Sequence, residues 1–307
     1  MDVHTHLVPE FWAEELKSHG GDPSGWGQPA WSKESVLAFM EKAEISCSIL
    51  SLTAPGIEGW SRAERPDIAR RVNDYGAELV RSDPDRFGYL CTLPLPDIEA
   101  SLAELKRCYD ELSVDGVCLH SNYDGNYLGD PLYDPLWSEL EARKATIFLH
   151  PTTPAGVKVL EGQPSPMEDY PADTTKVSLD LVTKGHMTRY PSVRIVLSHG
   201  GGFMPFVATR FAELGASITK GTSADHILAE LRKFYFDTAL VAPSGMPSLL
   251  AFAPADHIVF GTDFPYASEA VSLKFTENLD AFQGLDAETR TLIDKGAASL
   301  FPRLSSR

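Results

Sequence analysis

The fold and the site of this protein are both decided by a short stretch at the start of the chain, MDVHTH (residues 1–6). In an extended strand successive side chains point to opposite faces, so His4 and His6 point the same way. Two imidazoles held on a rigid strand form half of a site for a transition metal. A His-x-His pair is common by chance, so the rest of a metal site has to be sought further along the chain.

Three further side chains of the kind that bind metals follow short apolar runs. His150 ends the run ATIFLH, His199 ends VRIVLSH, and Asp263 follows IVFGT. Continuous apolar runs are typical of parallel strands that are buried on both faces. Because the catalytic groups of (β/α)8 barrels lie at the carboxyl ends of the strands, this recurrence indicates one site built by several strands.

The rest of the chain alternates such runs with amphipathic segments. We expect eight strands, at residues 1–6, 47–52, 87–93, 116–120, 145–150, 193–199, 233–237 and 257–261. No polar linker or break in composition separates them, which predicts a single α/β domain over residues 1–307, a metal-dependent (β/α)8 TIM barrel with inserted loops. The proline-rich residues 151–171 form the longest predicted loop and a candidate lid.

Composition excludes several classes of partner. The 27 Lys and Arg against 43 Asp and Glu give a net charge of −16 without a basic patch, so nucleic acid and anionic membrane are not expected as partners. There is no signal-peptide pattern and no run of about 20 apolar residues. Four cysteines without a C-x-x-C pair indicate buried thiols in a reducing compartment, so we expect a cytoplasmic protein.

Five segments together resemble the amidohydrolase superfamily, and more narrowly its decarboxylases, the group of aminocarboxymuconate-semialdehyde decarboxylase. They are DVHTH (2–6), FLHP (148–151), LSHGGG (197–202), YFDTA (235–239) and GTDFP (261–265). GGDPSGW (20–26) and SLTAPG (51–56) are further similar to fungal 6-methylsalicylate decarboxylases. The resemblance implies a metal-dependent, non-oxidative decarboxylase of a small hydroxybenzoate-type acid, with 6-methylsalicylate to m-cresol and carbon dioxide as the best candidate reaction.

The same resemblance implies roles for individual residues. One divalent ion per chain, zinc or alternatively manganese, would be bound by His4, His6, His150 and Asp263. Asp263 is also the expected proton donor, and His199 is expected beside the metal-bound water rather than on the metal. Binuclear members carry a bridging lysine at the end of strand four, whereas this chain has LHS (119–121) there, which predicts a single ion.

Two further residues are candidates for contact with a small aromatic carboxylic acid. His120 is either a substrate ligand or a hydrogen-bonded loop histidine. Arg210 matches a family arginine that reaches into the neighbouring subunit's site, which implies a homodimer or a higher homo-oligomer; the alternative is a solvated helix arginine. Asp237 is expected to be a structural acceptor. The remaining histidines are placed on surface segments without a role: His19, His186, His226 and His257.

The same residues also suit a second reaction class. A mononuclear metal site can hydrolyse a lactone, ester or amide, with Asp263 taking the proton from water. Only the family resemblance favours decarboxylation over hydrolysis at this point. The resemblance departs at the start of the chain, because the family's first strand begins several residues before the His-x-His pair, whereas this chain starts at Met1. That departure puts the packing of the strand in question but not its ligands.

Overall fold

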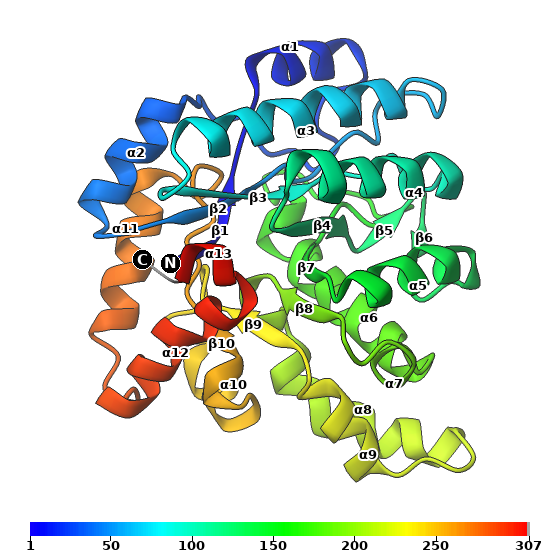
Figure 1. Ribbon diagram of the computed structural model, residues 1–307. Helices are drawn as coiled ribbons and strands as arrows, with labels where there is room; N and C mark the ends of the chain where they lie inside the picture. The colour runs from blue at the N-terminus through cyan, green and yellow to red at the C-terminus, as the bar shows by residue number, and fades with distance from the viewer. Residues whose placement is uncertain (306–307) are drawn as a thin grey trace.

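The computed structural model describes residues 1–305, and in them eight parallel strands close into a barrel (Figure 1). Around the barrel the strands keep their order in the sequence: β1 (Asp2–His6), β2 (Ser48–Ser51), β3 (Phe87–Cys91), β4 (Gly116–His120), β7 (Thr146–His150), β8 (Arg194–Leu197), β9 (Tyr235–Asp237) and β10 (Ile258–Val259). Hydrogen bonds from Val3 N to Phe260 O (3.0 Å) and from His6 N to Phe264 O (2.8 Å) join the last segment to β1. The predicted TIM barrel is confirmed; residues 306–307 of the predicted domain lie outside the described part.

Helices surround the barrel on the outside (Figure 1). They are α1 (Glu10–Ser18), α2 (Lys33–Lys42), α3 (Arg65–Ser82), α4 (Ile98–Arg107), α5 (Asp134–Arg143), α6 (Asp169–Thr183), α7 (His186–Arg189), α8 (Met204–Ile218), α9 (Ala224–Leu231), α10 (Met246–Phe252), α11 (Glu269–Asp280), α12 (Ala287–Leu300) and α13 (Pro302–Ser305). Short polar side chains start several of them: Ser32 and Ser35 form a capping box at α2, and Asp97 and Asp286 cap α4 and α12. None of the described helices is long and apolar enough to cross a membrane.

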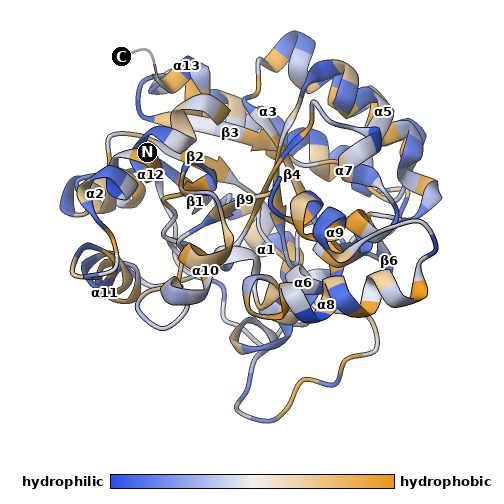
Figure 2. Ribbon diagram, turned by 90° about the horizontal axis from the view of Figure 1, so that it is seen from below, coloured by the Kyte–Doolittle hydropathy of each residue, from blue (hydrophilic) through white to orange (hydrophobic). Residues whose placement is uncertain are grey.

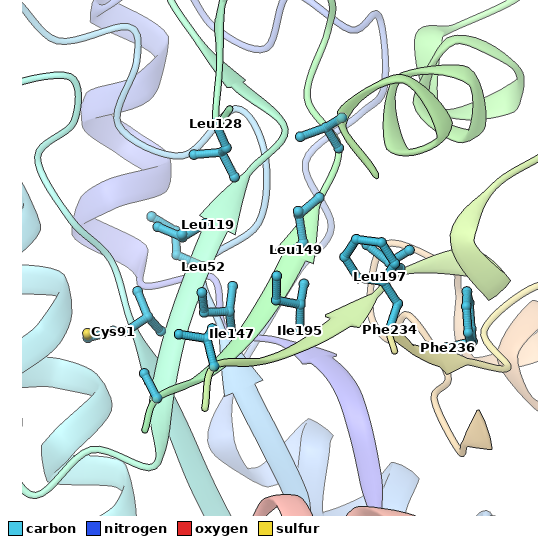
Figure 3. Packing of buried hydrophobic residues seen from close by; sticks show 14 of the residues in the cluster. Leu52, Cys91, Leu119, Leu128, Ile147, Leu149, Ile195, Leu197, Phe234 and Phe236 are labelled. Atoms are coloured by element: carbon cyan, nitrogen blue, oxygen red, sulfur yellow. The ribbon is translucent and has the colours of Figure 1, made fainter. Parts of the chain in front are cut away.

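Both faces of the strands are buried, which explains their continuous apolar sequence. Leu119 of β4 and Leu149 of β7 belong to the layer between strands and helices (Figure 3). Their neighbours Cys118 and Phe148 pack inside the barrel instead. The strands are the hydrophobic centre of the molecule, whereas the helices around them carry many polar residues (Figure 2).

The first strand departs from simple alternation. Val3 belongs to the cluster inside the barrel, and yet His4 and His6 also point inward, at the carboxyl ends of the strands. Strict alternation forbids this for residues 3 and 4. The pairing of β1 with β2 is irregular between Asp2 and Thr5, and an irregularity of this kind re-aims the side chains that follow it.

The structure corrects the sequence interpretation in three places. β8 ends at Leu197, and His199 lies in the 3₁₀ turn η4 (His199–Gly201) rather than in the strand. The predicted loop after β4 contains a hairpin of β5 (Asn122–Tyr123) and β6 (Asn126–Tyr127). The surface position expected for His186 is wrong: its side chain is 1% exposed. Burial also lowers the pKa of His186 to about 4.

Candidate functional site

Five polar side chains meet at the carboxyl ends of the strands, and we call this group the strand-end cluster. It consists of His4 and His6 from β1, His150 from β7, His199 from η4 and Asp263 from the loop after β10. His4 and His6 are completely buried and His150 is 3% exposed. The residues that the sequence analysis grouped because they follow apolar runs are therefore neighbours in space.

The nitrogen and oxygen atoms of this cluster converge closely. His4 Nε2 lies 3.0 Å from His6 Nε2 and 3.2 Å from Asp263 Oδ1, and His6 Nε2 lies 3.1 Å from the same oxygen. Ligand atoms of His4, His150, His199 and Asp263 all lie within 4.8 Å of one another, so this group could hold a metal ion. Three lone-pair-bearing atoms this close repel one another unless a proton or a metal cation lies among them, and a divalent cation suits that donor set.

Each imidazole of the first strand is held through its other nitrogen. His4 Nδ1 lies 2.7 Å from Asp237 Oδ2, and both side chains are fully buried. His6 Nδ1 lies 3.2 Å from Ser51 Oγ and 3.3 Å from Ser51 O. An Nδ1–H donated in this way leaves the Nε2 lone pair free for a ligand, which is the usual arrangement around metal-binding histidines.

The two remaining histidines differ in how firmly they are held. His150 Nδ1 lies 2.8 Å from the carbonyl oxygen of Pro151, and the Thr53 hydroxyl lies 3.2 Å from both ring nitrogens. His199 Nε2 lies 3.4 Å from Asp263 Oδ2, whereas its Nδ1 is buried without a hydrogen-bond partner in the described chain. His199 is thus close enough to reach an ion in the cluster or to orient the Asp263 carboxylate.

The pKa values of His4, His6 and Asp263 show that the cluster favours one buried positive charge. Burial lowers the pKa of His4, but the Asp237 and Asp263 carboxylates outweigh it and raise the value to about 10. Burial lowers the pKa of His6 to about 4. Burial alone would raise the pKa of Asp263, but His4 and His199 hold it well below its usual range. The two carboxylates therefore stabilise one buried cation among the imidazoles.

The backbone is bent to deliver two members of the cluster. His199 has φ 52° and Asp263 has φ 64°, in the left-handed region that L residues rarely adopt. Such positions cost on the order of 1–3 kcal/mol and occur where function fixes a side chain. Just before Asp263, a Cβ on Gly261 would lie 2.8 Å from the Cβ of His4, so only glycine fits there.

Asp2 is a functional residue that the sequence analysis did not single out. Its carboxylate accepts hydrogen bonds from His4 N (3.0 Å), Thr5 Oγ1 (2.7 Å), Thr262 N (3.1 Å) and Thr262 Oγ1 (2.6 Å). Asp2 therefore ties β1 to the loop that carries Asp263, and we call this arrangement the Asp2 clasp. The available signal was an acidic residue at the start of a strand predicted to be buried, because a buried carboxylate needs several donors. The structure shows Asp2 completely buried.

A cavity of about 510 Å³ opens above the strand-end cluster. Its inner end is formed by Thr53, His150, His199 and Asp263. Its walls are largely aromatic and aliphatic, from Trp26, Tyr170, Phe203, Leu240, Val241 and Tyr266. Pockets of this size, mostly apolar with a few convergent polar groups, bind small organic molecules.

The two residues predicted to contact substrate lie outside this cavity lining. His120 stacks on Tyr123, with its Nδ1 3.1 Å from Glu58 Oε1, and its ring centre lies 6.5 Å from that of His150. Arg210 is exposed on α8. Neither is among the described residues that line the cavity of this chain, so their roles stay predictions.

Comparisons with known proteins agree over almost the whole chain. The family described as amidohydrolase matches residues 1–303. The decarboxylase yanB of Aspergillus niger is 40% identical over 99% of this chain and 87% of its own length. A 6-methylsalicylic acid decarboxylase of Penicillium expansum is 37% identical over 99% of this chain and 96% of its own length.

Two solved structures superpose closely on the barrel. An amidohydrolase shares 31% identity with a TM-score of 0.92, over 98% of this chain and 99% of its own. A dihydroxybenzoic acid decarboxylase from Polaromonas sp. shares 25% identity with a TM-score of 0.79, over 98% of this chain and 95% of its own. The latter was solved with bound manganese and the inhibitor 2-nitroresorcinol.

Proposed function

Because the chain belongs to the amidohydrolase family, we propose that it is a metal-dependent decarboxylase of a hydroxybenzoate-type acid, with 6-methylsalicylate as the first substrate to test. One observation carries the proposal: the strand-end cluster opens into a largely apolar cavity of about 510 Å³, a size that suits a small substituted benzene ring. Relatives that match nearly the whole chain are decarboxylases, which favours this reaction over the hydrolysis that the same residues could perform.

The metal would be held by His4, His6, His150 and Asp263, with His199 within reach of it. A bound divalent ion, manganese or zinc, supplies a Lewis acid that withdraws electron density from the carboxylate and phenol oxygens of the substrate. Asp237 fixes the His4 ring through Nδ1, so that Nε2 faces His6 Nε2 and Asp263 Oδ1, where the ion would be held.

Asp263 and His199 would carry out the proton transfer. The ring carbon that bears the carboxylate must gain a proton before its bond to the carboxylate breaks, and Asp263 is the acid that lines the cavity at this end. The phenolic hydroxyl of the substrate can supply that proton through Asp263. The carbon–carbon bond electrons then restore the aromatic ring, so carbon dioxide and a phenolate result without an oxidant. His199, 3.4 Å from Asp263 Oδ2, would orient the carboxylate.

The walls of the cavity would keep water away from the reacting ring. Leu240 and Val241 offer only apolar surface to a bound ligand, and Tyr266 packs its ring 5.7 Å from that of His6. Exclusion of water strengthens the electrostatic interactions of the cluster with the substrate.

Purified, metal-loaded protein should release carbon dioxide from 6-methylsalicylate or a close 2-hydroxybenzoate and form the corresponding phenol. In deuterated water the deuterium should appear on the carbon that lost the carboxylate. The matching benzoate without the hydroxyl should be inert. Hydrolysis of a lactone, ester or amide, with no carbon dioxide from any hydroxybenzoate, would overturn the proposal.

We also propose a homodimer, because the outer face of α8 carries exposed apolar side chains. Positions 206, 210, 214 and 218 follow one another at four-residue spacing along α8, and three of them are exposed apolar side chains: Phe206 (82% exposed), Leu214 (55%) and Ile218 (84%). Arg210 is the fourth position of this row. The row begins near Phe203, which lines the cavity, so a partner bound along α8 would border the cavity mouth. Apolar rows of this kind mark protein–protein contacts.

If Arg210 crosses that contact, two inactive variants should complement each other. A mixture of Arg210→Ala and Asp263→Asn chains should regain partial activity, because each heterodimer contains one intact composite site. If verified heterodimers show no activity, Arg210 does not contribute to the partner's site.

We also propose a cytoplasmic location. All four cysteines are buried free thiols, as a reducing compartment allows.

A further inference from the structure

A second carboxylate, that of Asp22, lines the cavity away from the strand-end cluster. The Tyr266 ring packs on His6, and its hydroxyl donates to Gln28 Oε1 (2.8 Å). The Gln28 amide nitrogen in turn donates to Asp22 Oδ2 (3.4 Å). In this series of contacts Tyr266 and Gln28 stand between His6 and Asp22. Asp22 would therefore face the outer part of a ring whose reacting carboxylate is at the strand-end cluster.

Three loops hold Asp22 in this position. Within its own loop, Ser24 N donates to Asp22 Oδ1 (2.8 Å), and Trp26 N donates to Ser24 Oγ (3.1 Å). The loop after β7 is joined to it by Ser165 N, which donates to Ser24 O (2.9 Å). The loop after β10 is joined through the Trp26 indole, which donates to Tyr266 O (3.3 Å). The carboxylate is thus a fixed feature of the wall.

No positive side chain in the described cavity lining offsets this charge. The lining contains two acids, Asp22 and Asp263, and neither lysine nor arginine. Burial raises the pKa of Asp22, while hydrogen bonds from Ser24 oppose that rise. Where the carboxylate is ionised, a second anion brought beside it is repelled by the like charge. In a partly solvent-screened cavity, two like charges at ring distance weaken binding by roughly tenfold.

We propose that Asp22 is a specificity-determining residue that excludes substrates with a second negative charge, so that the site takes monocarboxylic hydroxybenzoates and rejects dicarboxylic acids. The inference rests on the proposed function for the orientation of the ring, with its reacting carboxylate at the strand-end cluster. It adds a residue and a rule of selection: a negative charge at the outer end of the ring excludes an acid that the cavity is large enough to take.

Matched pairs of ligands test this inference. The pairs are 2-hydroxybenzoates that carry at ring position 4 or 5 either a carboxylate or a carboxamide, which is neutral and of nearly the same size. Their dissociation constants are measured by calorimetry at pH 7.5 on the metal-loaded wild type, Asp22→Asn and Asp256→Asn. Asp256 is an exposed acid of η5 (Ala255–His257), at the opposite end of the barrel, so its variant makes the same change in net charge.

In the wild type and in Asp256→Asn, at least one carboxylate should bind roughly tenfold more weakly than its carboxamide partner. Asp22→Asn should reduce that ratio to about twofold by strengthening carboxylate binding, while carboxamide binding changes by about twofold or less. An unchanged ratio in Asp22→Asn would overturn the proposal. Wild type that binds the carboxylate as tightly as the carboxamide, or that binds neither, would overturn it as well.

Two precautions keep the result decisive. If Asp22→Asn does not fold, Asp22→Ser also removes the charge and still offers an oxygen to the Ser24 N–H, so the same ratio is measured there. Binding needs no turnover, so the two proposals fail separately. If Asp22→Asn reduces the ratio of carboxylate to carboxamide dissociation constants but no carbon dioxide is released, the decarboxylase is rejected and the role of Asp22 is kept. If carbon dioxide is released but that ratio is unchanged, the decarboxylase is kept and the role of Asp22 is rejected.

Discussion

The inner and outer ends of the cavity are built in opposite ways. At the inner end, the strand-end cluster stands on strands and short turns, and His4 and His6 are completely buried. The outer end consists of the loops at residues 20–28 and 151–168, where Leu160 is 57% exposed and Met167 is 62% exposed. Side chains on strands are positioned more accurately than side chains on loops. From this difference we expect substitutions in the barrel to affect the chemical step, and substitutions in the loops to affect substrate choice and to be better tolerated.

The largest expected effect lies at the inner end. Asp263→Asn should lower turnover by about a thousandfold or more, in decarboxylation and in the reverse carboxylation at high bicarbonate, because one carboxylate both binds the metal and relays the proton. Turnover is measured as carbon dioxide released, and elemental analysis of the same sample shows how much metal remains. Activity within tenfold of the wild type would contradict the role of Asp263 and the expected difference between the inner and outer ends of the cavity.

His199→Ala should lower turnover by about a hundredfold and retain most of the metal, because His199 is expected to orient Asp263 rather than to hold the ion. His150→Ala is the matched comparison, since it removes a predicted ligand from the same cluster. Equal loss of metal in both variants would instead make His199 a ligand, as the 4.8 Å grouping of His4, His150, His199 and Asp263 allows.

Asp237→Asn should weaken metal binding by about 10–100-fold without abolishing it, because Asp237 acts on the ion only through His4 Nδ1. Competition with a chelator measures the affinity, and Asp256→Asn controls for the change in charge. Metal affinity equal to that of the control would show that the His4 ring keeps its orientation without Asp237.

Substitutions at the outer end should have the smallest effects. Met167→Ala should raise KM by about threefold or less with kcat unchanged, because Met167 lines the cavity and contacts no member of the cluster. Leu160→Ala, in the same loop but outside the cavity lining, should change neither constant and shift the free energy of unfolding by about 0.5 kcal/mol or less. A loss of kcat in either variant would mean that the loop contributes to the chemical step.

The sequence predicted the site best where a candidate ligand stands at or just after the carboxyl end of an apolar run. The barrel and the neighbourhood of His4, His6, His150 and Asp263 followed from apolar runs and their carboxyl ends, because parallel strands bring those ends together. The position of His199 in a turn did not follow, because a polar residue directly after an apolar run can be either the end of the strand or the start of a turn, and here β8 ends at Leu197.

Contacts between distant segments were out of reach of such patterns. The Asp2 clasp joins residues 260 positions apart, and the role of Asp22 depends on a network across three loops. The sequence analysis places His186 on a surface segment, but Trp137 lies against its ring, with the ring centres 5.2 Å apart. Burial of that kind is decided by tertiary packing rather than by local sequence.

The Asp2 clasp also has a consequence for the order of events during synthesis. Two of its four donors belong to the first strand and the other two to Thr262 in the loop after β10, so the carboxylate of Asp2 has no complete set of partners until Thr262 has left the ribosome. Asp263 emerges at the same moment. A nascent chain that already displays His4 and His6 therefore presents only a weak, flexible pair of imidazoles to passing ions. If the strand-end cluster holds the proposed ion, firm capture would wait for Asp263, when more than four-fifths of the chain has been translated.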